Sequence, residues 1–88
     1  VEKDPKKAFY WFSQTAEDDP AGLYWRALCY DNGLGVDQDE DWACRLYQES
    51  AAHGYAPALC NLGVCYESGQ GVEKDPAKAV ELYRQAAI

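Results

Sequence analysis

Four cysteines and a single histidine are the residues of this 88-residue chain that could bind a metal, form disulfides or act as nucleophiles. The cysteines are Cys29, Cys44, Cys60 and Cys65. They form no C-x-x-C pair of the kind typical of zinc sites, and His53 lies beside Gly54 in an expected link between helices. We therefore expect buried, unpaired thiols that act as small apolar residues, with no metal and no cofactor. Unpaired thiols favour a reducing compartment, the cytoplasm.

A run of carboxylates is the second group with possible chemistry. It contains Asp37, Asp39, Glu40 and Asp41. Alternating carboxylates are typical of calcium loops, but Trp42 stands where the sharp turn needs glycine, and residues 44–48 supply no carboxylate. We expect Asp39 to cap a helix and the others to be solvated. The run could also steer a basic partner by long-range attraction.

Composition and motifs exclude several classes of function. The formal net charge is −7, which disfavours nucleic-acid binding because phosphate contacts require basic clusters. No apolar run approaches the roughly 20 residues of a membrane span, so we expect no membrane insertion. The chain has no Ser-His-Asp order, no G-x-S-x-G and no phosphate loop, and we expect no enzyme.

The positions of these residues follow from a repeat with a step of 36 residues. Residues 22–52 align without a gap on residues 58–88, and eleven of the 31 positions are identical. The identical pairs include Cys29 with Cys65, Tyr47 with Tyr83, and Asp39 with Asp75. A step of this length is typical of a solenoid, in which each unit buries its apolar face against its neighbours.

Prolines, aspartates and glycines divide each copy into two helices. We predict helices over 5–17, 40–52 and 76–87, each begun by an aspartate cap, and helices over 20–32 and 57–68, each begun near a proline. A G-x-G-V turn should join the helices within a copy. The structural turn and cap residues are Gly33, Gly35, Val36 and Asp39, then Gly69, Gly71, Val72 and Asp75.

The second copy resembles the Sel1-like repeats, which are relatives of the tetratricopeptide repeats. The residues that carry the resemblance are Ala58, Leu62, Gly63, Tyr66, Gly69, Gly71, Val72, Asp75, Lys78, Ala79, Tyr83, Ala86 and Ala87. The longer step and the G-x-G-V turn favour this family over ordinary tetratricopeptide repeats of about 34 residues. The resemblance implies an all-α fold, an α/α superhelical solenoid of helix-turn-helix repeats with about five helices. It also implies an adaptor or scaffold that holds partners in a concave groove.

We expect one domain over 1–88, with the second helix of a preceding repeat at 1–21 and repeats at 22–57 and 58–88. Val1-Glu2-Lys3-Asp4-Pro5 recurs at 72–76, so the chain is expected to be a fragment of a longer array. The first copy departs from the family at Arg26, where Leu62 stands in the second copy. Its stem could pack while the guanidinium reaches an acidic neighbour, or this end of the repeat could be loosened.

The candidate binding residues lie on a helical stripe that the core does not use. The stripe comprises Trp25, Leu28 and Asn32 in one copy and Asn61, Val64 and Ser68 in the next. Stacked repeats would align these on a groove wall that binds a protein or peptide, with Trp25 as a large anchor. Packing of Trp25 and Leu28 against a neighbouring helix is the alternative.

A different function is a structural or regulatory spacer that self-associates through its end helices. Phe9, Tyr10, Trp11 and Phe12 give the first predicted helix apolar residues on nearly every side. Such a surplus indicates burial against another repeat, a partner or a second copy. The identity of any partner does not follow from the sequence.

Overall fold

The computed structural model describes residues 19–88, and every regular element in this part of the chain is an α-helix. The helices are α2 (Pro20–Asn32), α3 (Glu40–Ala52), α4 (Ala56–Ser68) and α5 (Pro76–Ala87). The predicted bounds agree with these to within one residue, and the all-α fold class is confirmed. The helix that we predict at 5–17, with its aromatic residues 9–12, lies outside the described residues.

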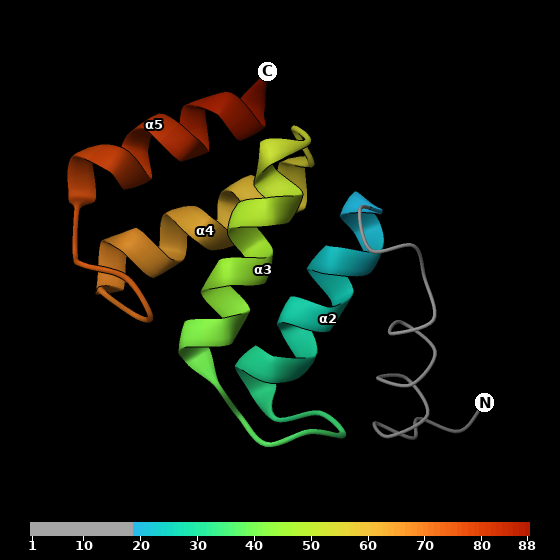
Figure 1. The fold of residues 1–88 in the computed structure, drawn as a ribbon. Coiled ribbons are helices and arrows are strands. Elements are labelled where there is room, and N and C mark those ends of the chain that lie inside the picture. The colour runs from blue at the N-terminus through green and yellow to red at the C-terminus, as the bar shows by residue number, and fades with distance from the viewer. Residues whose placement is uncertain (1–18) are drawn as a thin grey trace.

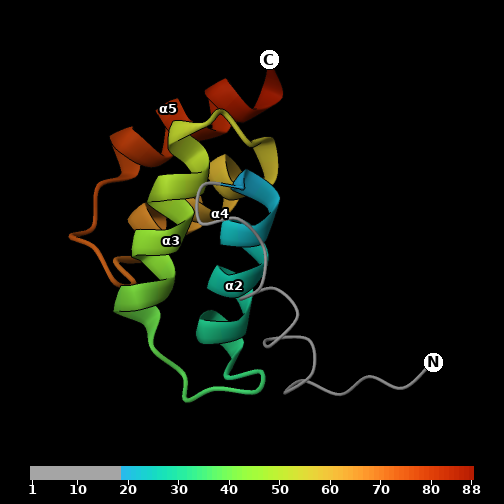
Figure 2. The ribbon, with the colours of Figure 1, turned by 45° about the vertical axis from the view of Figure 1, so that its right-hand side comes forward.

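The helices form two pairs. The α2 helix packs against α3, and α4 packs against α5, while α3 and α4 join the pairs (Figure 1). The second pair is turned relative to the first, and a turned view shows the same order of helices (Figure 2). Two similar helix pairs joined with a rotation are the geometry of an α/α superhelix.

The two G-x-G-V turns have the same backbone conformation. Gly33 and Gly69 end α2 and α4 in the left-handed region, with φ of 67° and 74°. Their N–H groups donate to the carbonyls of Cys29 and Cys65, which satisfies helix-end acceptors. The ends of α2 and α4 therefore share one backbone conformation, as the repeated glycines predict.

The helices α3 and α5 each begin after a capping aspartate, and the backbone N–H of that aspartate also bonds the preceding helix. The Oδ1 atoms of Asp39 and Asp75 both accept from the N–H three residues on, each at 3.1 Å. The N–H of Asp39 donates to the Tyr30 carbonyl at 2.9 Å, and that of Asp75 to the Tyr66 carbonyl at 2.8 Å. These bonds fix where the second helix of each pair starts.

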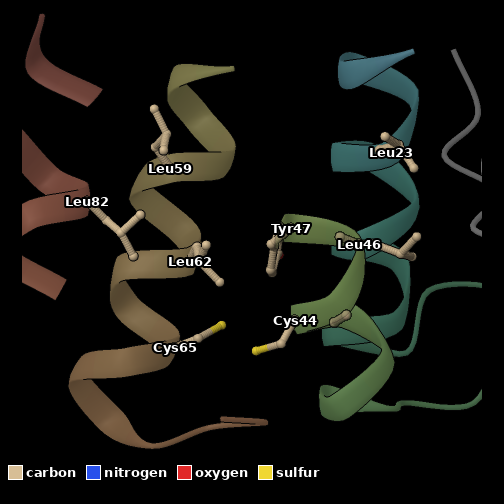
Figure 3. Close-up of a cluster of buried hydrophobic side chains, with 10 residues drawn as sticks. Leu23, Cys44, Leu46, Tyr47, Leu59, Leu62, Cys65 and Leu82 are labelled. Atoms are coloured by element: carbon tan, nitrogen blue, oxygen red, sulfur yellow. The ribbon is translucent and has the colours of Figure 1, made fainter. Parts of the chain in front are cut away.

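The core lies between the helix pairs and within each of them (Figure 3). Leu23 and Leu46 are buried between α2 and α3, and Leu82 reaches the core from α5. Tyr47 has no exposed surface and is the largest fully buried side chain among the described residues. Val72, under the second turn, also packs against this core.

Gly63 allows a close approach between α4 and α5. A Cβ atom at this position would lie 2.7 Å from Cε1 of the Tyr83 ring. The ring therefore occupies the space that a side chain on α4 would take.

Arg26 is half-buried, and its Nε atom is enclosed without a hydrogen-bond partner. The acidic neighbour that we considered for it is not found among residues 19–88, where the recorded ion pair joins Arg84 to Glu81 at 4.0 Å. Leu62, its counterpart in the second copy, is only 5% exposed. An enclosed polar atom without a partner costs free energy, so the first copy packs less favourably here than the second.

Gly71 and Gly54 form a matched pair for testing how closely the turn meets α3. Both have positive φ, 76° and 80°. Alanine at either should cost about 1–2 kcal/mol from backbone strain. A Cβ on Gly71 would also lie 2.6 Å from the Glu40 carbonyl oxygen, whereas a Cβ on Gly54 meets nothing within 4 Å. Gly71→Ala should therefore lose a further ~1–3 kcal/mol in urea denaturation. Equal losses in the two variants would contradict this close approach.

Candidate functional site

The candidate binding residues lie on α2 and α4, the first helix of each pair, and we call them the α2–α4 stripe. They are Trp25, Leu28, Asn32, Asn61, Val64 and Ser68. Trp25 is 43% exposed and Val64 is 51% exposed, so both present apolar surface to solvent. Leu28 is half-buried and packs against the core, so it supports the stripe from beneath.

Two polar members of the stripe bond their own helices. The Asn32 side-chain amide donates to the Leu28 carbonyl at 3.0 Å, and the Ser68 hydroxyl donates to the Val64 carbonyl at 2.9 Å. Asn32 and Ser68 occupy the same position of the two copies. They end the stripe in the same way on both helices.

The third polar member, Asn61, joins a hydrogen-bond chain that crosses the repeat boundary. Its Nδ2 donates to the Tyr47 hydroxyl at 3.2 Å, and that hydroxyl donates to Oδ2 of Asp31 at 3.2 Å. Gln70, in the second turn, donates to Oδ1 of Asp31 at 2.8 Å. Burial raises the pKa of Tyr47, as does the nearby Asp31 charge, while the Asn61 bond acts in the opposite direction. The hydroxyl therefore stays protonated and remains the donor to Asp31.

The second copy contains the same tyrosine–carboxylate pair. The Tyr83 hydroxyl donates to Oε1 of Glu67 at 2.8 Å, and this bond is the main reason that the pKa of Tyr83 is raised. These pairs are not among the residues predicted from the sequence. The signal was present, because Asp31 and Glu67 are 36 residues apart, as are Tyr47 and Tyr83.

An aromatic cluster around Tyr24 supports Trp25. The Tyr24 ring centroid lies 5.3 Å from that of Trp25 and 5.5 Å from that of Tyr55, both edge to face. The ring centroid of Tyr47 lies 6.0 Å from that of Tyr24. Repeat comparison misses this cluster because the positions that match Tyr24 and Tyr55 hold cysteine and aspartate. The Trp25 side chain is thus partly exposed and packs edge to face with Tyr24.

Three of the four free thiols are buried, as expected, but Cys60 is exposed. Cys60 lies on α4 at the position that Tyr24 holds in the first copy, where the side chain does not enter the α4–α5 core. The sulfurs of Cys44 and Cys65 point toward each other between α3 and α4 (Figure 3). The Cys44 thiol donates to the Gln70 carbonyl at 2.9 Å. Burial raises the pKa of Cys29, Cys44 and Cys65.

The acidic run shows capping geometry rather than a cation cage. Asp39 caps α3, and Asp37, Glu40 and Asp41 are exposed. In residues 19–88 no group of three or more His, Cys, Asp or Glu side chains is placed to hold a metal ion. No helix in the same range is long and apolar enough to span a membrane.

Comparison with known families identifies the class of protein. The family model described as Sel1 repeat matches residues 1–19, 20–55 and 56–88. The chain therefore belongs to the Sel1 repeat family. No curated protein matches the chain significantly.

Solved structures show the same architecture. A Sel1 repeat protein from Oxalobacter formigenes is 37% identical with a TM-score of 0.85, and the match covers 93% of this chain and 35% of that one. The protective antigen c5321 of uropathogenic Escherichia coli, described as displaying an SLR fold, is 40% identical with a TM-score of 0.89 over 99% of this chain and 19% of that one. Cysteine rich protein B of Helicobacter pylori shares the fold at 24% identity, with a TM-score of 0.87 over 97% of this chain and 65% of that one.

The chain thus spans less than two thirds of each of these structures. Sel1-repeat proteins are generally scaffolds for protein–protein interaction, and the family is a non-catalytic one. A protein partner is consistent with this membership.

The hydroxyl of the fully buried Tyr47 should matter more than that of the half-buried Tyr83. Tyr47→Phe removes one of the two donors to Asp31 and the acceptor of the Asn61 amide, and should cost about 1–3 kcal/mol of unfolding free energy. Tyr83→Phe removes only an exposed bond to Glu67 and should cost about 0.5 kcal/mol or less. Urea denaturation monitored by circular dichroism measures both. A larger loss for Tyr83→Phe would contradict the role given to Tyr47.

Thiol labelling should distinguish the cysteines. Cys60 is exposed, whereas the other three are buried, so N-ethylmaleimide should modify one thiol quickly in the folded protein and all four in denaturant. Mass spectrometry counts the adducts over time. Cys60→Ser should remove the fast phase. Rapid modification of two or more thiols in the folded chain would show that the core is more open than described.

Proposed function

We propose that the chain is a protein-interaction scaffold that binds a protein or peptide partner along the α2–α4 stripe. The observation that carries this proposal is the exposure of Trp25 and Val64, 43% and 51%, on the first helix of successive repeats. Large apolar groups that stay exposed on a well-packed scaffold are typical of interaction sites. The rest of the stripe is held by the core, by its own helices or by Tyr47.

Trp25 is the anchor of the proposed surface. Tryptophan is enriched among residues that dominate binding energy, and it binds best when its position is fixed in advance. The edge-to-face contact with Tyr24 provides such a position. When a partner residue covers this ring, Trp25 should therefore lose little further side-chain freedom.

Val64 and the neighbouring polar groups extend the surface along α4. Val64 offers an apolar contact one repeat away from Trp25, and Ser68 lies one turn further along the same helix. Asn61 stands between the repeats and is already bonded to Tyr47. The affinity of a partner that bonds the Asn61 amide would therefore depend on how the two repeats pack together.

The charge of the chain favours a basic partner. The net charge is −7, and α2 and α4 each carry a carboxylate in their last turn, Asp31 and Glu67. Such a surface attracts cationic partners from a distance and raises their association rate, an effect that salt screens. Association should therefore slow as salt concentration rises, while much of the apolar contact persists.

Two tryptophans of nearly equal exposure provide the test. Trp25 is 43% exposed and Trp42, on α3, is 42% exposed. Peptides selected from a display library against the chain can be titrated by calorimetry into Trp25→Ala and Trp42→Ala variants. Trp25→Ala should weaken binding roughly 30-fold, as expected for an anchor residue, and Trp42→Ala less than about twofold.

Circular dichroism of both variants controls for folding, because loss of helix would remove binding for a trivial reason. Equal weakening by the two changes, or an effect of Trp42→Ala alone, would place the binding surface elsewhere and would contradict the proposal.

A further inference from the structure

Cys44 and Cys65 bring two buried thiols together at the boundary between the repeats. Cys44 lies on α3 and is 1% exposed, and Cys65 lies on α4 and is 4% exposed. Their sulfurs point toward each other (Figure 3), and a hydrogen bond joins the two thiols. The 36-residue step would place further copies of Cys44 at positions 8 and 80, which hold alanine and valine. The pair therefore distinguishes this boundary, and the common repeat does not require it.

Of the two thiols, Cys44 is the one that a small molecule can approach. A hollow of about 430 Å³ lies beside α3 and the second turn, and its wall contains Asp41, Cys44, Arg45, Gln48 and Gly71. The Cys44 thiol donates to the Gln70 carbonyl at 2.9 Å, next to Gly71 in that turn. An oxidant in the hollow therefore meets Cys44 first, with the Cys65 sulfur behind it.

Both thiols stay protonated at neutral pH. Burial raises the pKa of Cys44 and of Cys65, and the hydrogen bond between them lowers the pKa of Cys44 and raises that of Cys65. Because the thiolate is the reactive form, Cys44 should meet an oxidant much more slowly than the exposed Cys60 does. Reaction within the pair is favoured by position instead, since a neighbour that is already in place reacts as if it were highly concentrated.

We propose that Cys44 and Cys65 form an oxidation site, a dithiol that hydrogen peroxide converts into a disulfide between the two repeats. The Cys44 sulfur, once it has lost its proton to water, attacks one peroxide oxygen. An S–O bond forms, the O–O bond breaks, and hydroxide leaves and takes up a proton to become water. The Cys65 sulfur then attacks the Cys44 sulfur, so that the S–S bond forms, the S–O bond breaks, and a second water leaves with the Cys65 proton. The two thiols lose two electrons, and one peroxide becomes two waters.

The disulfide acts on the contact between the repeats. It joins α3 to α4 and closes the segment 44–65 into a covalent loop, which reduces the freedom of the unfolded chain. It also removes the thiol hydrogen that the Gln70 carbonyl accepts, while the Gln70 side chain keeps its bond to Asp31. Oxidation therefore strengthens the link between the repeats at the expense of one hydrogen bond to the second turn. The inference concerns the α3–α4 boundary and does not rest on the α2–α4 stripe.

The first test maps the disulfide in a Cys60→Ser chain, because the exposed Cys60 is expected to react first. After treatment with hydrogen peroxide, the mass should fall by two hydrogen atoms, and the thiols counted in denaturant should fall from three to one. Cleavage after Glu40 separates Cys29 from Cys44, so digestion at glutamates should yield one linked pair of peptides that holds Cys44 and Cys65. A disulfide through Cys29, a gain of oxygen atoms without a linked pair, or three intact thiols after an exposure roughly a hundredfold longer than Cys60 needs would each overturn the proposal.

A matched pair of variants tests the effect on stability. Cys29→Ala with Cys60→Ser keeps the proposed pair, whereas Cys44→Ala with Cys60→Ser keeps Cys29 and Cys65, which are also two buried thiols. Peroxide should lower the unfolding equilibrium constant of the first variant roughly a hundredfold, reversibly with dithiothreitol, and change that of the second by less than about twofold. Circular dichroism before oxidation checks that both variants fold, and the peptide map of the Cys60→Ser chain needs neither of them. Equal effects of peroxide on the two variants, or a first variant that oxidation destabilises, would show that the pair is not such a site.

Discussion

The burial of Tyr47 between two repeats is the interaction on which the rest of the structure depends. Its ring has no exposed surface, so its hydroxyl must find partners inside the protein. Asp31 from its own repeat accepts from it, and Asn61 from the next repeat donates to it. A shift of one repeat against the other would break these bonds and leave buried polar groups unpaired. Tyr47 therefore fixes the register of α2, α3 and α4, and with it the relative position of the helices that carry Trp25 and Val64.

The helices could be predicted almost to the residue because their ends are set by local chemistry. Gly33 and Gly69 end helices where a left-handed backbone is required, and Asp39 and Asp75 begin them by accepting backbone N–H groups. Such signals act over three or four residues and need no knowledge of tertiary packing. The fixed 36-residue step then indicates that the helix pairs repeat, which is the main content of the fold.

Contacts between repeats could not be predicted in the same way, because they depend on the angle between helix pairs. The Asn61 bond to Tyr47 joins residues of different copies, and the contact of Tyr24 with Tyr55 joins α2 to the link between α3 and α4. The exposure of Cys60 depends on the same angle, since it decides which side of α4 is covered. A comparison of copies finds what they share, and these residues lie where the copies differ.

Many positions shared by the copies form the core and the turns, whereas Trp25 lies at the surface and Asn61 bonds across the repeat boundary. Chemical-shift mapping of the 15N-labelled chain with a bound peptide tests most directly where a partner binds. The largest amide shifts should fall on α2 and α4, around Trp25, Asn61 and Val64. Shifts concentrated on the outer sides of α3 and α5, with the stripe unchanged, would contradict a binding surface on the first helices.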